Sequence, residues 1–117
     1  MARSLNGSTQ FLSNAAFAAG SFPVTISARF RPVTIAGFYQ RIATYQTSGA
    51  DTIASILLNY PNAGDVANQT YKGAVNALPS KAGAVANTWH HAAAVSESGS
   101  NTIYLDGVQG STSSYSD

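Results

Sequence analysis

The stretch NTWHHAAAVSESGSNTIYLDGVQGS (residues 87–111) decides the fold that this sequence predicts. Its segment WHHAAAVS (89–96) has small side chains on both faces, as is typical of a strand packed between two neighbours. After the turn ESGS, residues 101–105 have the pattern of a returning strand. Asp106 and Gly107 then predict a two-residue hairpin loop, because both residue types adopt positive φ. The stretch therefore predicts a three-stranded antiparallel meander.

The loop of this hairpin also fixes a register. In a two-residue loop, Leu105 and Val108 lie directly opposite each other. Ile103 then shares their face of the sheet, whereas Tyr104 and Gln109 share the other face, because side chains alternate along a strand. The predicted meander therefore has a defined set of cross-strand neighbours.

Upstream of this stretch, apolar residues again recur with the period of a strand. FPVTISARFRP (22–32) alternates apolar and polar side chains between two prolines, which predicts a half-buried strand. The other predicted segments are strands at 40–47 and 51–59 joined at residues 48–50, a turn at 60–65, a weakly alternating stretch at 69–77, and a loop or short irregular segment at 78–87. We expect seven or eight strands in one all-β domain that comprises residues 1–117.

The composition narrows the classes of protein. The 117 residues suffice for one domain with a modest core. Charged residues make up only 9%, against a typical value of about 25%, and the net charge is +1. Such a chain lacks the basic surface that a non-specific nucleic-acid binder needs. It has no apolar run long enough for membrane insertion, and its first 21 residues are too polar for a secretion signal.

Three segments resemble one family, in the order in which that family carries them. Residues 87–111 are similar to the G-T-W-H-H-V-A … (I/L)-x-L-Y-(V/L)-D-G segment of laminin-G-like domains, which belong to the concanavalin A-like lectin/glucanase superfamily. LNGSTQFLS (5–13) resembles the usual opening strand of these domains, and residues 22–32 resemble the strand that follows it. The first eight residues also resemble short laminin-G-like proteins of bacteriophages and environmental bacteria. The resemblance implies an all-β, concanavalin A-like jelly-roll sandwich.

The sequence departs from the family pattern at two places. Ala28 or Phe30 stands where the family often has tryptophan. Family members also continue beyond the hairpin through several more strands, which have no counterpart before Asp117. Either the chain is a fragment or the architecture is reduced, and we expect a sandwich that is shortened at its C-terminus.

The run Trp89-His90-His91 admits a metal-site interpretation and a structural one. Adjacent residues of a strand point to opposite faces, so His90 and His91 cannot easily bind one ion. The resemblance implies that both histidines are structural and that they pack and hydrogen-bond within the sheets. We expect Trp89 in the core, and Asp106 and Gly107 as a structural hairpin loop.

The acidic residues favour neither catalysis nor metal binding. Laminin-G-like domains often hold calcium through aspartates, which makes Asp106 a calcium candidate, but Ca²⁺ takes six to eight oxygens and the chain has five acidic residues. No two of them lie within eight positions of each other, so the carboxylate pair of a glycosidase is not indicated. The sequence also lacks a Gly-x-Ser-x-Gly elbow and the spacing of a zinc site. We therefore expect no enzymatic activity and no cofactor.

Aromatic side chains are the candidates for ligand binding, because an aromatic face suits the apolar side of a sugar ring. Tyr60, in the predicted turn, and Tyr104, on the face opposite Leu105, are expected to be exposed and to contact a ligand. The resemblance implies a glycan or a protein surface as the partner, in an extracellular, cell-surface or virion setting.

Two functions and one assembly state follow from these observations. The first function is a lectin-like carbohydrate-binding module that recognises cell-surface glycans. The second is a structural protein, such as a bacteriophage virion decoration or fibre domain. The segment VQGSTSSYS (108–116) contains no charge and no proline, so it predicts an edge strand without the usual protection and hence a homo-oligomer.

Overall fold

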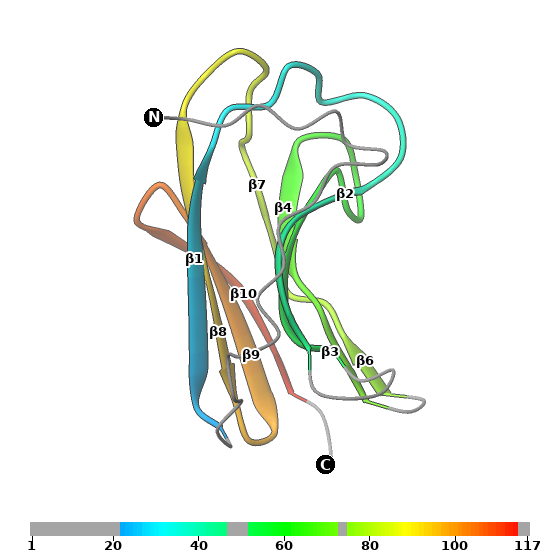
Figure 1. Ribbon diagram of the computed structural model, residues 1–117, viewed down its shortest axis with the longest axis vertical. Coiled ribbons are helices and arrows are strands. Elements are labelled where there is room, and N and C mark those ends of the chain that lie inside the picture. The colour runs from blue at the N-terminus through cyan, green and yellow to red at the C-terminus, as the bar shows by residue number, and fades with distance from the viewer. Residues whose placement is uncertain (1–21, 47–51, 73–74, 115–117) are drawn as a thin grey trace.

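A computed structural model describes residues 22–46, 52–72 and 75–114 of the chain, and these ranges form two antiparallel β-sheets that face each other (Figure 1). The opening strand expected at residues 5–13 and the turn expected at 48–50 lie outside the described residues. In the described ranges, no helix is long and apolar enough to cross a membrane. The described strands are β1 (Val24–Phe30), β2 (Gln40–Gln46), β3 (Thr52–Leu58), β4 (Asp65–Asn68), β5 (Thr70–Lys72), β6 (Val75–Ala77), β7 (Ser80–Ala82), β8 (His90–Glu97), β9 (Ser100–Leu105) and β10 (Val108–Ser114).

The four-stranded sheet has the order β1-β8-β9-β10, so its last three strands form the meander that the sequence predicts. Asp106 and Gly107 form the two-residue loop between β9 and β10, with φ of 52° and 80°. Leu105 pairs with Val108, and Tyr104 pairs with Gln109. The predicted loop and the predicted register are both confirmed.

Strand β8 lies between β1 and β9, which explains its small side chains. Ala92 and Ala94 are buried on its inner face, where β1 contributes the partly buried Ile26, Ala28 and Phe30. Because β8 is a central strand and its inner side chains are small, the opposite sheet can approach closely over it. The alternation of β1 matches the half-buried strand expected at residues 22–32.

The six-stranded sheet is built around β3, which pairs with β2 on one side and with β4 and β5 on the other. Two of its strands differ from the sequence prediction. Residues 65–68 form β4 although the sequence indicated only a turn ending at Asp65, and the loop expected at 78–87 contains β7. The two short strands pair with each other, Ala67 opposite Ser80. Strands of three or four residues are specified by such long-range pairing, which a local pattern does not show.

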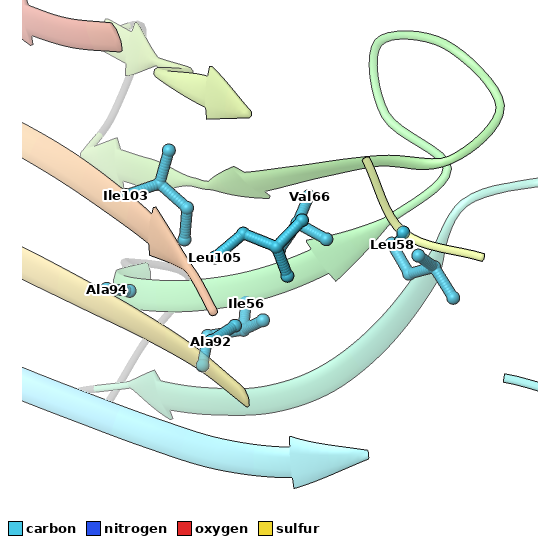
Figure 2. Packing of buried hydrophobic residues seen from close by; sticks show 8 residues of the cluster. Ile56, Leu58, Val66, Ala92, Ala94, Ile103 and Leu105 are labelled. Atoms are coloured by element: carbon cyan, nitrogen blue, oxygen red, sulfur yellow. The ribbon is translucent and has the colours of Figure 1, made fainter. Parts of the chain in front are cut away.

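The apolar core lies between the sheets (Figure 2), and its residues on β9 stand in the half of that strand nearer the β9–β10 hairpin, paired with its residues on β8. Each large side chain buried there stabilises the fold by about 1.5–3 kcal/mol. Half-buried residues of β1 and β2 pack around its border. The buried cluster comprises Ile56, Leu58, Val66, Ala84, Ala92, Ala94, Ile103 and Leu105.

A buried polar cluster joins the sheets in the other half of the interior. The Asn68 amide nitrogen on β4 lies 3.1 Å from the Val95 carbonyl oxygen, 3.2 Å from Ser96 Oγ and 3.2 Å from the Thr102 carbonyl oxygen. The Asn101 amide donates to Thr70 Oγ1 at 2.5 Å. Because a buried polar group without a partner costs free energy, these hydrogen bonds allow asparagines where apolar residues would otherwise stand.

Strands β7 and β10 close one side of the sandwich. Ser111 Oγ accepts a hydrogen bond from the Ser80 main-chain N–H at 2.8 Å and donates one to the Ser80 carbonyl oxygen at 3.2 Å. The pairing of β10 with β9 shifts register between Gln109 and Thr112, which is a β-bulge. The expectation that this edge lacks protective devices is therefore wrong, because a bulge and a cross-sheet contact both hinder strand addition.

Candidate functional site

His90, His91 and Asp106 form a clamp that holds the β9–β10 hairpin against the start of β8. Asp106 Oδ2 lies 2.7 Å from His90 Nδ1, and Asp106 Oδ1 accepts a hydrogen bond from the His91 main-chain N–H at 2.8 Å. The Asp106 N–H donates to the His91 carbonyl oxygen at 2.8 Å. These bonds continue the β8–β9 pairing past its last ladder pair, Ala92 and Leu105. The clamp, defined as His90, His91 and Asp106, therefore positions the hairpin loop.

The other ring nitrogen of His90 reaches the loop before β8. The Val85 N–H donates to His90 Nε2 at 2.9 Å, so the neutral tautomer with its proton on Nδ1 satisfies both contacts. His90 is 5% exposed, and its ring lies 5.8 Å from that of Phe30. Both nitrogens of His90 are thus occupied by the protein itself.

The carboxylate of Asp106 is stabilised in its charged form. Burial raises the pKa of Asp106, but the hydrogen bonds from the His91 main-chain N–H and from the His90 ring lower it by more. The net result is that the pKa of Asp106 lies below its ordinary value. In the part of the chain that the structure describes, no group of three or more His, Cys, Asp or Glu side chains could hold a metal ion.

Trp89 is not a core residue, contrary to the prediction. Its side chain is 50% exposed and lies on the outer face of the four-stranded sheet, where the Arg29 guanidinium sits 5.2 Å from the ring centroid. The reason is the alternation of side chains: His90 points inward, so Trp89 and His91 on either side of it point outward.

Three loops meet at one end of the sandwich, between β1 and β2 (31–39), β3 and β4 (59–64), and β7 and β8 (83–89) (Figure 1). We call this surface the loop end. The Gly64 carbonyl oxygen accepts hydrogen bonds from the N–H groups of Gly83 and Ala84, at 3.3 and 2.9 Å. These bonds join the second loop to the third.

The first loop is bonded to the third as well. Arg31 Nε donates to the Asn87 carbonyl oxygen at 3.0 Å, and the Asn87 N–H donates to the Pro32 carbonyl oxygen at 2.7 Å. A contact between aromatic rings joins the first loop to the second: the centroids of Tyr39 and Tyr60 are 5.9 Å apart, with an interplanar angle of 86°. The loop end is therefore one connected surface and not three independent loops.

The sequence analysis missed several exposed apolar residues at the loop end. Phe38 is 94% exposed and Val33 is 82% exposed, and Tyr39 and Val85 are also exposed. Their signal in the sequence is an apolar run, RPVTIAGFY, that does not alternate and that carries Pro32 and Gly37. Exposed apolar residues that gather on one surface mark an interaction site.

The two predicted ligand-binding tyrosines lie on different surfaces. Tyr60 lies at the loop end, half-buried against Tyr39. Tyr104 lies on β9, on the face that points away from the core residues Ile103 and Leu105. The structure therefore does not bring Tyr60 and Tyr104 into one site, although each keeps part of its surface exposed.

The fold and these surfaces define an antiparallel two-sheet sandwich whose loops carry an apolar and aromatic rim. A family model described as the concanavalin A-like lectin/glucanases superfamily, of the laminin-G type, matches residues 5–117. The chain belongs to this laminin-G-like branch of the superfamily, and it has the jelly-roll β-sandwich of a lectin-like binding module. No curated protein and no solved structure matches the chain.

Proposed function

We propose that this protein is a non-catalytic carbohydrate-binding module that contacts its glycan through the loop end. The observation that supports this function is the edge-to-face pair of Tyr39 and Tyr60. Sugar rings present an apolar face and a polar rim, and tyrosine offers the matching combination of an apolar ring with a hydroxyl group. The intended ligand is a glycan of a cell surface.

Polar groups stand beside the ring pair in fixed positions. Asn62 is exposed in the same turn as Tyr60, and its amide nitrogen donates to Asp65 Oδ2 at 2.9 Å. That bond leaves the Asn62 amide oxygen available as an acceptor for a sugar hydroxyl group. A few polar groups held around an aromatic surface are the usual means of orienting a small ligand.

The bonded loops support binding because they lower its entropic cost. A loop that is ordered only when the ligand arrives loses conformational freedom at that moment, which weakens the affinity. Here the main-chain bonds from Gly64 to Gly83 and Ala84, and those between Pro32, Arg31 and Asn87, hold the three loops in place beforehand.

The proposal that the protein is non-catalytic is based on where its described acidic residues lie. Asp106 is engaged by the clamp, and Asp65 accepts from Asn62. Glu97 stands at the end of β8 that is farther from the loop end. A glycosidase needs two carboxyl groups on either side of one sugar bond, and the described acidic residues serve other contacts or other places.

A glycan array probed with the full chain tests the function, followed by calorimetry on any glycan that binds. Tyr39→Ala should weaken that binding about tenfold, which corresponds to about 1.4 kcal/mol. Tyr71→Ala is the matched control, because Tyr71 is an exposed tyrosine on β5, which pairs with the opposite end of β3. Binding that survives Tyr39→Ala, or an array without any hit, would contradict the proposal.

One observation favours the second candidate, a structural protein of an assembly such as a virion decoration or fibre. Phe38 and Val33 are almost fully exposed, and apolar side chains of this kind suit a protein partner better than a sugar. If assembly is the function, the protein should sediment as an oligomer, and a double variant Val33→Ser with Phe38→Ser should dissociate that oligomer. Val108→Ser, which removes an exposed valine at the β9–β10 hairpin, serves as the control and should leave it intact.

A further inference from the structure

The outer face of the four-stranded sheet carries a second set of side chains suited to a ligand. Cross-strand pairing arranges them in rows: Arg29 lies opposite His91, and in the next row Ser27 lies opposite Ala93, which lies opposite Tyr104. In Figure 1 this face points away from the other sheet. All five residues are on the faces of their strands that alternate with the core residues.

Arg29 is held in place without using its hydrogen-bonding groups. The Trp89 ring lies 5.2 Å below its guanidinium carbon, and among the described residues Arg29 has no hydrogen bond or ion pair. Stacking on a tryptophan restricts the guanidinium plane while the N–H groups at its edge stay free. A planar guanidinium with free N–H groups matches the two oxygens of a carboxylate.

His91 places a second donor beside Arg29. The two residues are direct cross-strand neighbours, so their Cβ atoms are about 4.5–5.5 Å apart. An anion between the two side chains would accept hydrogen bonds from the Arg29 guanidinium and from an N–H group of the His91 ring.

The acidic residues within reach do not fill this position. Both oxygens of Asp106 are engaged by His90 and by the His91 main chain, at the end of the hairpin. Glu97 lies six residues along β8 from His91, which is about 20 Å in a strand. Arg29 and His91 therefore form a donor pair, and the described residues supply no counter-charge for the Arg29 guanidinium.

Tyr104 lies one row away, with only small side chains before it. On the side toward β1, the next residues in its row are Ala93 of β8 and Ser27 of β1, so the Tyr104 ring is bordered by little side-chain volume there. Serine and threonine hydroxyl groups of the outer face, such as Ser27 and Thr25, lie exposed nearby. A ring, small neighbours and hydroxyl groups suit a sugar, whereas the donor pair of Arg29 and His91 suits an acid group.

The geometry points to a binding site for acidic saccharides on this face, in which Arg29 and His91 bind the carboxylate of a uronate and Tyr104 stacks on the sugar ring. The site lies on another surface than the loop end, so it is independent of the function proposed above. It differs from that function in requiring a negative charge on the ligand.

The probes are oligomers of galacturonate, of mannuronate and guluronate, and of glucuronate, each compared with its carboxyl-reduced form by calorimetry. We expect at least one uronate oligomer to bind the full chain and to lose about tenfold or more in affinity on reduction, since charged hydrogen bonds are the stronger ones. If none of them binds, or if reduction leaves the affinity unchanged, the inference is overturned.

Variants locate the binding on this face. Arg29→Ala and Tyr104→Ala should each weaken uronate binding about tenfold, whereas Arg41→Ala, which removes the same charge from β2 of the other sheet, should change it less than twofold. Arg29→Lys keeps the charge and serves if the alanine variant unfolds, and it should lose affinity because lysine cannot bind two oxygens at once. Equal losses for Arg29→Ala and Arg41→Ala would show non-specific charge attraction and overturn the site. Tyr39→Ala should leave uronate binding unchanged, which separates this test from that of the loop end.

Discussion

Gly110 on β10 offers the sharpest test of how the sandwich closes. A Cβ atom at this position would lie 2.6 Å from the Ser80 carbonyl oxygen, 2.8 Å from Lys81 Cβ and 2.9 Å from Ile103 Cγ2. All three distances are shorter than real Cβ contacts, and the nearest atom belongs to the main chain, which cannot rotate away. Gly110→Ala therefore forces β7 and β10 apart.

The expected loss combines two effects. Overpacking a tight contact costs about 1–3 kcal/mol, and moving β7 also strains the two bonds between Ser80 and Ser111, each worth about 1 kcal/mol. We expect a loss of about 2–4 kcal/mol, which lowers Tm by roughly 10 °C or more for a chain of this size. Circular dichroism on heating and in urea measures both quantities.

The matched control is a glycine without close neighbours. A Cβ at Gly107 meets nothing within 4 Å, but its φ is +80°, so Gly107→Asn tests backbone strain without overpacking. This variant should cost less than about 1 kcal/mol. If Gly110→Ala melts within about 2 °C of the unchanged protein, the close approach of β7 and β10 is refuted, because the added methyl group would then have room.

Three further predictions concern the clamp, Trp89 and assembly. The pKa of Asp106 is lowered in the folded state, so its contribution to stability is complete above the ordinary carboxyl pKa and is lost as pH falls through the lowered value. Unfolding in urea should therefore need less denaturant below about pH 4. The Asp106→Asn variant should show a smaller change over the same pH range. Trp89→Ala should cost less than about 2 kcal/mol, measured by thermal melting, whereas a loss of 3–5 kcal/mol would mean a buried ring. Because Val33 and Phe38 leave apolar surface exposed at the loop end, sedimentation at micromolar concentration should give a homodimer, and a 12.1 kDa monomer would contradict that expectation.

The sequence predicts the meander well because its signals are local. Asp106 and Gly107 determine a loop with two positive φ angles, and that loop determines the pairing of Leu105 with Val108. Strand β1 is predicted equally well, since its alternation of apolar and polar side chains is bounded by two prolines. Where two adjacent residues specify a turn, the cross-strand neighbours follow without knowledge of the rest of the chain.

The predictions from sequence are wrong where residues far apart in the chain determine the structure. Strands β4 and β7 exist because they pair with each other and β4 also pairs with β3, and neither strand carries a pattern of its own. The sequence predicts Trp89 in the core, but a strand offers two faces, and the bonds of His90 with Val85 and Asp106 select which face is inward. The exposed Phe38 and the contact of Tyr39 with Tyr60 depend on three loops that are far apart in the sequence.

The hydrogen bonds of Asn68 affect which sequence changes this fold can accept. Its amide reaches the main chain of both β8 and β9, so one side chain of the six-stranded sheet fixes the sliding position of the four-stranded sheet. Apolar side chains alone would allow small shifts between the layers, whereas hydrogen bonds to two carbonyl groups accept one position. The stems of the loops at the far end therefore keep their spacing whatever residues the loops contain. The domain can exchange its binding residues, by evolution or by grafting, without realigning its sheets.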